Sequence, residues 1–178
     1  GFVYKHTSNM IADVSGFTSC WELGIYRQTN GSKYWHSKFN YPSYGVSIFQ
    51  QINPNRDTLG ITTSLLPSIR FVWWRNHRWE GFFGLGTGLA VVSKIFDAEK
   101  NPNNNLMGSH LNVHVQLKPG IRYRFHPNWS MSLSGAVHHV SNGLLKQPNL
   151  GTNYFGGNLA LSYHFAKTDI QQAPEPST

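Results

Sequence analysis

The amino-acid sequence predicts an all-β protein, an eight-stranded antiparallel β-barrel of the transmembrane, outer-membrane type. Three observations support this prediction: apolar and polar residues alternate over long segments, charged residues are scarce while aromatic residues are plentiful, and short turns alternate with long loops. Charged residues make up 13% of the chain and aromatic residues 14%, whereas soluble domains carry about 25% charged residues. This composition is typical of a protein that is solvated partly by lipid.

The longest alternation covers residues 111–125. One face of this segment is entirely apolar, while the other carries polar, cationic or glycine residues. A soluble strand usually has about 5–6 residues, so this length suits a tilted strand that crosses a membrane. Residues 129–138 and 154–165 repeat the pattern. In a membrane barrel, the apolar face contacts lipid and the polar face lines the interior.

Five earlier segments complete a count of about eight strands. They are expected at residues 2–13, 18–26, 41–51, 59–74 and 79–92. No run reaches the roughly 20 consecutive apolar residues that a membrane helix needs. Because only helices and closed barrels satisfy every backbone polar group inside hydrocarbon, a spanning chain of this kind must close its strands into a barrel.

Turn lengths agree with this count. Outer-membrane barrels have short periplasmic turns and longer outer loops, and with both termini in the periplasm the turns after even-numbered strands are periplasmic. Residues 75–78 and 126–128 are short and fall on that side, whereas residues 94–108 and 143–151 are long and fall outside. Residues 27–40 are the exception, because they are long where a short turn is expected.

The barrel is expected to occupy residues 1–165. The polar, proline-rich residues 166–178 are expected to form a disordered end or the start of a linker. No signal peptide precedes Gly1, so the sequence is interpreted as a mature form. Cys20 is the only cysteine, which excludes an intramolecular disulfide and indicates a small strand residue.

The densest group of polar residues lies near the outer end of the seventh expected strand. By parity, His139 and Ser141 continue its lipid-facing side. Side chains two residues apart on one strand face originate roughly 6–7 Å apart, so the imidazole can reach the hydroxyl. A base beside a hydroxyl is the first half of an activated nucleophile. Asn142 and the Gly143 backbone N–H follow directly and are candidate oxyanion donors.

Histidine and serine at this spacing also occur simply as polar residues at the membrane–water boundary. The outward parity of the pair and its depth near the outer leaflet favour a site instead. His138 faces the interior by parity and is interpreted as a hydrogen-bonding residue there. A second His-x-Ser-Asn, at residues 6–9, is placed nearer the periplasmic end of the first strand and is interpreted as a coincidence. No pair of histidines has metal-ligand spacing, so neither a metal nor another cofactor is expected.

A family resemblance rests on these residues. The segment His139-Val140-Ser141-Asn142-Gly143, the loop motif Pro148-Asn149-x-Gly151 and a last strand ending Tyr163-His164-Phe165 resemble the PagL family of outer-membrane lipid A 3-O-deacylases. The resemblance implies an eight-stranded barrel with its site on the outer wall, which removes the ester-linked acyl chain at position 3 of lipid A without a metal. It also implies that Ser141 is the nucleophile and His139 the general base, with Asn142 and Asn149 supporting the oxyanion or the site.

The sequence departs from the family pattern at one position. The family places a carboxylate early in the last strand to orient the histidine, and that position here is Asn153. An amide can hold an imidazole by a hydrogen bond but does not stabilise the imidazolium by charge, a loss that costs up to about 10⁴ in rate. Asp13 is a second candidate for the orienting group, because the first strand must pair with the last to close the barrel.

Three functions compete. The first is an ester hydrolase acting on the lipid A of lipopolysaccharide in a Gram-negative outer membrane, with outer-loop lysines attracting the phosphates (Lys94, Lys100 and Lys146). The second is a catalytically impaired barrel that serves as a structural subunit with protein partners. The third is a soluble ligand-binding barrel such as a lipocalin. The net charge of +7 is scattered, which favours outer-membrane lipids over nucleic acid as partners.

Overall fold

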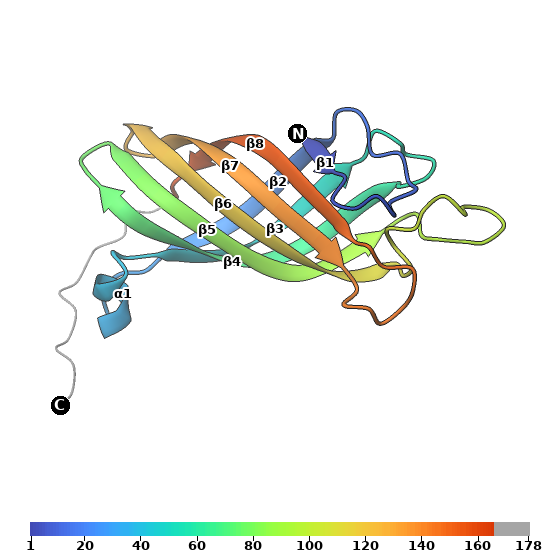
Figure 1. The fold of residues 1–178 in the computed structure, drawn as a ribbon. Helices are drawn as coiled ribbons and strands as arrows, with labels where there is room; N and C mark the ends of the chain where they lie inside the picture. Colours follow the sequence, from blue (N-terminus) through green and yellow to red (C-terminus); the bar gives the residue numbers. More distant parts are fainter. Residues whose placement is uncertain (166–178) are drawn as a thin grey trace.

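The computed structural model describes residues 1–165, which form eight strands and one short helix. The strands make one antiparallel sheet in the order β1-β8-β7-β6-β5-β4-β3-β2, and this sheet curls into a barrel (Figure 1). Their bounds are β1 (Phe2–Tyr4), β2 (Ser19–Gln28), β3 (Ser43–Ile52), β4 (Ile61–Arg75), β5 (Trp79–Val92), β6 (Leu111–His126), β7 (Trp129–Ser141) and β8 (Thr152–Tyr163). The predicted all-β, eight-stranded fold is confirmed. The tail expected at residues 166–178 lies outside the described residues.

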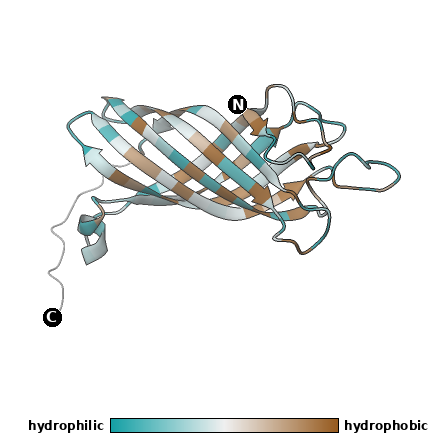
Figure 2. Cartoon of the chain, in the orientation of Figure 1, coloured by the Kyte–Doolittle hydropathy of each residue, from teal (hydrophilic) through white to brown (hydrophobic). Residues whose placement is uncertain are grey.

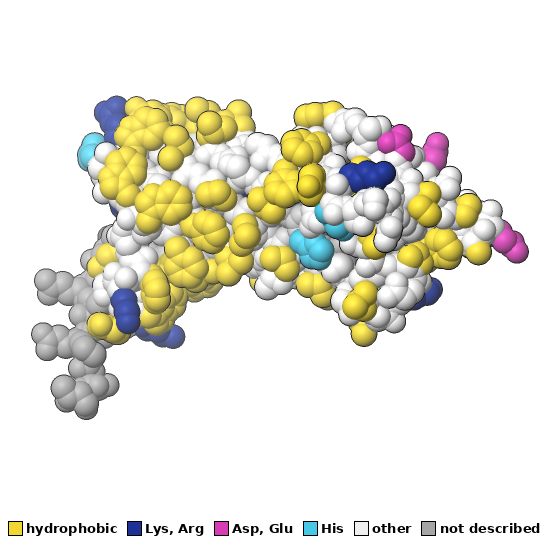
Figure 3. Space-filling view, in the orientation of Figure 1, with side chains coloured by type: hydrophobic (Ala, Val, Ile, Leu, Met, Phe, Trp, Pro, Cys, Tyr) yellow, Lys and Arg dark blue, Asp and Glu magenta, His cyan; other side chains and the backbone are white. Residues whose placement is uncertain are grey.

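Apolar side chains face outward along the wall and polar side chains face inward. On β7, Ser132 and Ser134 are buried, while Leu133 between them is 59% exposed. Figure 2 shows this alternation of hydropathy along the strands, and in Figure 3 hydrophobic side chains cover much of the barrel surface. The arrangement is the reverse of a soluble barrel and confirms the predicted lipid-facing side.

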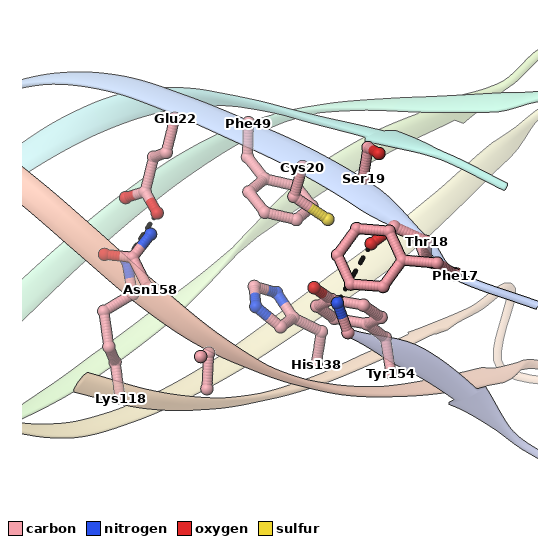
Figure 4. A pocket seen from close by; sticks show the side chains of 13 residues that line it. Phe17, Thr18, Ser19, Cys20, Glu22, Phe49, Lys118, His138, Tyr154 and Asn158 are labelled. Carbon is pink, nitrogen blue, oxygen red and sulfur yellow. Dashed lines mark hydrogen bonds and ion pairs between the residues drawn. The ribbon is translucent and has the colours of Figure 1, made fainter. Parts of the chain in front are cut away.

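Paired charges fill part of the polar interior. Glu80 on β5 accepts hydrogen bonds from Arg75 (2.8 Å) and Arg122 (2.9 Å), and Glu22 on β2 pairs with Lys118 on β6. Burying a charge without a partner costs free energy. The ion pairs therefore explain how charged residues are accommodated in the interior of the barrel. Figure 4 shows Glu22 and Lys118 in a cavity of about 240 Å³ inside the barrel.

The connections follow the predicted pattern. The links between β4 and β5 and between β6 and β7 are short turns at one end of the barrel, whereas residues 93–110 and 142–151 form long loops at the other end. The long segment after β2 contains helix α1 (Tyr34–Lys38) and lies at the short-turn end (Figure 1), so it lengthens a turn without changing the strand count. No helix among residues 1–165 is long and apolar enough to cross a membrane.

The first strand is shorter than predicted. It was expected over residues 2–13, but β1 ends at Tyr4, which pairs with Asn153 on β8. The residues beyond Tyr4 do not continue the strand, and their buried side chains pack instead on the loops at the outer end. That cluster contains Met10, Ala12, Val14, Leu59, Leu106 and Met107. The prediction that residues 6–9 lie nearer the periplasmic end is therefore wrong: they follow β1 at its outer end.

Candidate active site

The structure brings His139 and Ser141 into direct contact on the outer face of β7. The Ser141 hydroxyl lies 3.0 Å from the His139 Nε2, a hydrogen bond in which the hydroxyl donates. Alternation along the strand places both side chains on one face. His138, the residue before His139, points to the opposite face, where it is buried and hydrogen-bonded to His114. A hydroxyl that donates to a neutral imidazole is arranged to lose its proton to that base.

Asn153 completes the series from the neighbouring strand. It lies directly opposite His139 in the β7–β8 register, where side chains on one face are close enough to interact. The His139 Nδ1 lies 2.7 Å from the Asn153 Oδ1. Because an amide oxygen only accepts, the imidazole carries its proton on Nδ1, and this leaves Nε2 free to accept from Ser141.

The site lies at the boundary between the apolar wall and the polar outer loops. His139 is exposed, and its neighbours across the register are Val115 on β6 and Asn153 on β8. Val113 is 47% exposed opposite Ser141. Figure 3 shows histidine side chains on the surface where the hydrophobic belt meets the loops. An apolar chain can therefore lie along the wall and reach the serine without entering the barrel.

The turn after Ser141 is held by Asn142. Its buried amide donates to the Ser109 Oγ (2.8 Å) and to the Lys146 carbonyl (2.9 Å), and its backbone N–H donates to the Asn149 Oδ1 (3.2 Å). Both hydrogens of the Asn142 amide are thus used within the loops, which favours a supporting role. The backbone N–H of Gly143 and the Asn149 Nδ2 are the remaining candidate oxyanion donors.

Gly151 is a residue of the loop motif whose structural role the sequence did not reveal. Its φ is +71°, in the left-handed region that favours glycine. A Cβ at this position would lie 2.9 Å from the Val140 carbonyl oxygen and 3.2 Å from both the His139 Cε1 and the Ser141 Cβ. Only a glycine lets the chain enter β8 this close to His139 and Ser141. The sequence did show a glycine shortly before the last strand. That glycine indicated a turn, but it did not indicate the close approach to His139 and Ser141.

The structure also brings His6 to the site, a contact that the interpretation of residues 6–9 as a coincidental motif did not predict. Its Nδ1 lies 3.1 Å from the Asn153 Nδ2. The error came from the length assigned to the first strand: because β1 ends opposite Asn153, the residues after it reach the site. No local sequence signal distinguishes His6, since its place depends on the closure of the barrel.

Asp13, the alternative orienting group, is engaged elsewhere. Its Oδ1 accepts hydrogen bonds from the Ser15 Oγ (2.6 Å) and the Ser15 backbone N–H (2.9 Å). These bonds hold the pKa of the Asp13 carboxyl below its usual value. The partner of the His139 Nδ1 is Asn153, as its spacing in the family pattern indicated. Within residues 1–165, no cluster of three or more His, Cys, Asp or Glu side chains could hold a metal ion.

Comparisons with known proteins agree with this architecture. A family model described as lipid A 3-O-deacylase (PagL) matches residues 18–162, a range that extends from β2 into β8 and includes the residues from His139 to Asn153. The crystal structure of the outer membrane enzyme PagL is similar, with a TM-score of 0.57 and 19% sequence identity over 82% of this chain and 88% of that chain. At this identity, the structural likeness supports the fold alone. No curated protein sequence matches the chain.

Proposed function

The chain belongs to the lipid A 3-O-deacylase (PagL) family, and from this premise we propose that it is an outer-membrane serine esterase that removes the ester-linked 3-O acyl chain from the lipid A of lipopolysaccharide. The observation that carries the proposal is the hydrogen-bonded series Ser141–His139–Asn153 on the lipid-facing wall. In this series, a hydroxyl, a base and an orienting group are already in contact.

In the acylation step, the Ser141 Oγ attacks the ester carbonyl carbon and His139 Nε2 takes the hydroxyl proton. The carbonyl oxygen becomes an oxyanion, for which the Gly143 N–H and the Asn149 Nδ2 are the proposed donors. The tetrahedral species collapses by breaking the bond to the sugar oxygen. His139 returns the proton to that oxygen, so the products are a free sugar hydroxyl and an acyl ester of Ser141.

In the deacylation step, water attacks the acyl ester while His139 Nε2 accepts a proton from it. Collapse of the second tetrahedral species releases a fatty acid and restores the Ser141 hydroxyl, which recovers the proton from His139. Asn153 holds the imidazole in the tautomer that both steps need. None of these steps calls for a metal or another cofactor.

The surroundings of the site suit a substrate with acyl chains and phosphates. Exposed apolar side chains border the catalytic pair on the wall, among them Val113 and Val137. Exposed lysines are present on the outer loops (Lys94, Lys100 and Lys146), where they can attract phosphate groups. A Gram-negative outer membrane presents both chemistries together in its outer leaflet, which is the proposed location.

Mass spectrometry of lipid A tests the proposal. Cells of a Gram-negative host without such an activity are compared before and after expression of the chain, and we expect lipid A to lose one acyl chain. Ser141→Ala abolishes this change. The control is Ser32→Ala, an exposed serine in the connection between β2 and β3 at the opposite end of the barrel, which retains the activity. An unaltered acyl pattern with the intact protein contradicts the proposal, as does full activity in Ser141→Ala.

A second function is supported by the amide at position 153. If an uncharged orienting group leaves the base too weak, the chain is a structural subunit of an outer-membrane complex. Purification in mild detergent separates the two functions. A stoichiometric assembly without hydrolase activity supports the subunit, whereas an active monomer supports the esterase.

A further inference from the structure

We infer that His6 is a positioning residue of the catalytic series, and that it sets which atom of the Asn153 amide faces His139. The inference rests on the proposed esterase function and extends it by one residue. His6 lies outside the residues matched by the family model, which begin at residue 18, and it comes to the site through the strand β1 rather than through the motif around Ser141.

The hydrogen bonds run in one direction through four residues. The Ser141 hydroxyl donates to the His139 Nε2 over 3.0 Å, and the His139 Nδ1–H donates to the Asn153 Oδ1 over 2.7 Å. The Asn153 Nδ2 then donates to the His6 Nδ1 over 3.1 Å. His6 therefore acts as the acceptor that ends the series, as a neutral imidazole with its proton on Nε2.

An amide needs such a partner where a carboxylate does not. The oxygen and the NH₂ group of Asn153 are nearly equal in shape, and a rotation of 180° exchanges them. In the rotated form, the NH₂ group donates to the His139 Nδ1 and the imidazole proton moves to Nε2. That nitrogen can then no longer accept the proton of Ser141. A carboxylate presents an acceptor in both orientations and has no such inactive form.

The fold holds His6 beside the Asn153 amide. Tyr4 lies opposite Asn153 in the β1–β8 register, so the chain passes beside Asn153 as it leaves the strand. The segment beyond is fixed to an outer loop by Asn105, which donates to the Asn9 carbonyl (2.6 Å) and accepts from the Ile11 N–H (3.0 Å). His6 is thus held between a strand and an anchored segment.

Substitutions at residue 6 that differ in hydrogen-bonding sense test the inference. His6→Asp places an oxygen where the imidazole Nδ1 lies and can only accept, so we expect kcat within about threefold of the original protein. His6→Leu removes the acceptor and lowers kcat by about tenfold, the equivalent of one hydrogen bond. His6→Lys can only donate, draws the amide oxygen away from His139, and lowers kcat further. In an Asn153→Asp background, where no inactive orientation exists, His6→Leu has little effect.

A spectroscopic measurement on the 178-residue chain in detergent gives a readout that needs no substrate. The ¹⁵N shifts of His139 are expected to report the Nδ1–H tautomer in the original protein and in His6→Asp, and a mixture of tautomers in His6→Leu. His77→Leu, in the exposed turn between β4 and β5, is the control and leaves the shifts of His139 unchanged. A circular dichroism spectrum like that of the original protein confirms that each variant is folded.

The two proposals fail in different ways. If the original protein hydrolyses lipid A but His6→Leu changes neither kcat nor the tautomer of His139, the role of His6 is overturned. An equal loss for Asp, Leu and Lys at residue 6 overturns it too, because hydrogen-bonding sense then does not matter. If the tautomer responds as expected but lipid A is not hydrolysed, the positioning role stands and the proposed substrate is wrong.

Discussion

The His139 Nδ1 lies 2.7 Å from the Asn153 Oδ1, across the pair of strands β7 and β8. The contact joins a base to a neutral acceptor on the lipid-facing wall. It orients the imidazole as a carboxylate would, but it would not offset the positive charge that the imidazole acquires in the proposed attack by Ser141. The imidazole is therefore held in a defined orientation but has no carboxylate charge beside it. Substitutions at and around Asn153 test both properties.

Asn153→Asp is expected to raise the rate of ester hydrolysis. The carboxylate keeps an acceptor at the same position and stabilises the imidazolium formed in each step, so kcat rises by about 10- to 1,000-fold, within the about 10⁴ that separates an acid from an amide at such a position. Single-turnover measurements with a chromogenic acyl ester in detergent give the ratio. Asn153→Ala loses the orienting bond and is slower than the original protein. A rate that is equal in the Asp and Ala variants contradicts the role assigned to this residue.

Gly151→Ala is expected to lower kcat with little change in KM. The added Cβ would lie 2.9 Å from the Val140 carbonyl oxygen and 3.2 Å from both the His139 Cε1 and the Ser141 Cβ. A small displacement of the His139 and Ser141 side chains costs about 10- to 100-fold in rate. Gly16→Ala is the matched control, since its φ of +102° is also left-handed and its Cβ would meet Pro54 instead. Kinetics of both variants on the same ester separate a local effect from backbone strain. Equal losses in the two variants would show that strain alone is responsible.

Glu80→Gln is expected to destabilise the barrel. Glu80 is 9% exposed and receives hydrogen bonds from Arg75 and Arg122, so its neutralisation leaves a buried guanidinium without a counter-charge. Breaking a buried pair in this way costs about 3–5 kcal/mol. Urea unfolding in phospholipid vesicles, followed by tryptophan fluorescence, measures the change. Glu99→Gln, on an exposed loop, is the control and changes the free energy of unfolding little.

Leu159→Arg tests which side of the barrel contacts lipid. Leu159 lies near the middle of β8, is 69% exposed and pairs with Leu133. An arginine on the lipid face near the bilayer midplane costs about 2–4 kcal/mol. The same substitution at Leu65, on the outward face of β4, is expected to have a similar effect, whereas Phe39→Arg near the short-turn end costs less. A barrel that tolerates Leu159→Arg fully would not be embedded in a bilayer along this strand.

Most of the fold could be predicted because strand parity is a local property. The alternation in residues 111–125 and 129–138 was sufficient to assign the lipid face, and it placed His139 outward and His138 inward as found. The same rule failed for residues 5–13. Alternation records only that one face is buried, and it does not distinguish burial in a barrel wall from burial under the outer loops.

For the candidate site too, the local relationships could be predicted from the sequence and the long-range contacts could not. His139 and Ser141 share a face because they are two residues apart on one strand, and the sequence by itself determined that relationship. Asn153 was placed by its spacing within the motif, but its contact with His139 depends on the register of β7 against β8. The tertiary structure decided that register, the approach of Gly151 and the arrival of His6, because each depends on how segments distant in the chain meet when the barrel closes. The local sequence pattern determines which face of the sheet a side chain occupies. The residue that it contacts there depends on which distant segments pair with that strand.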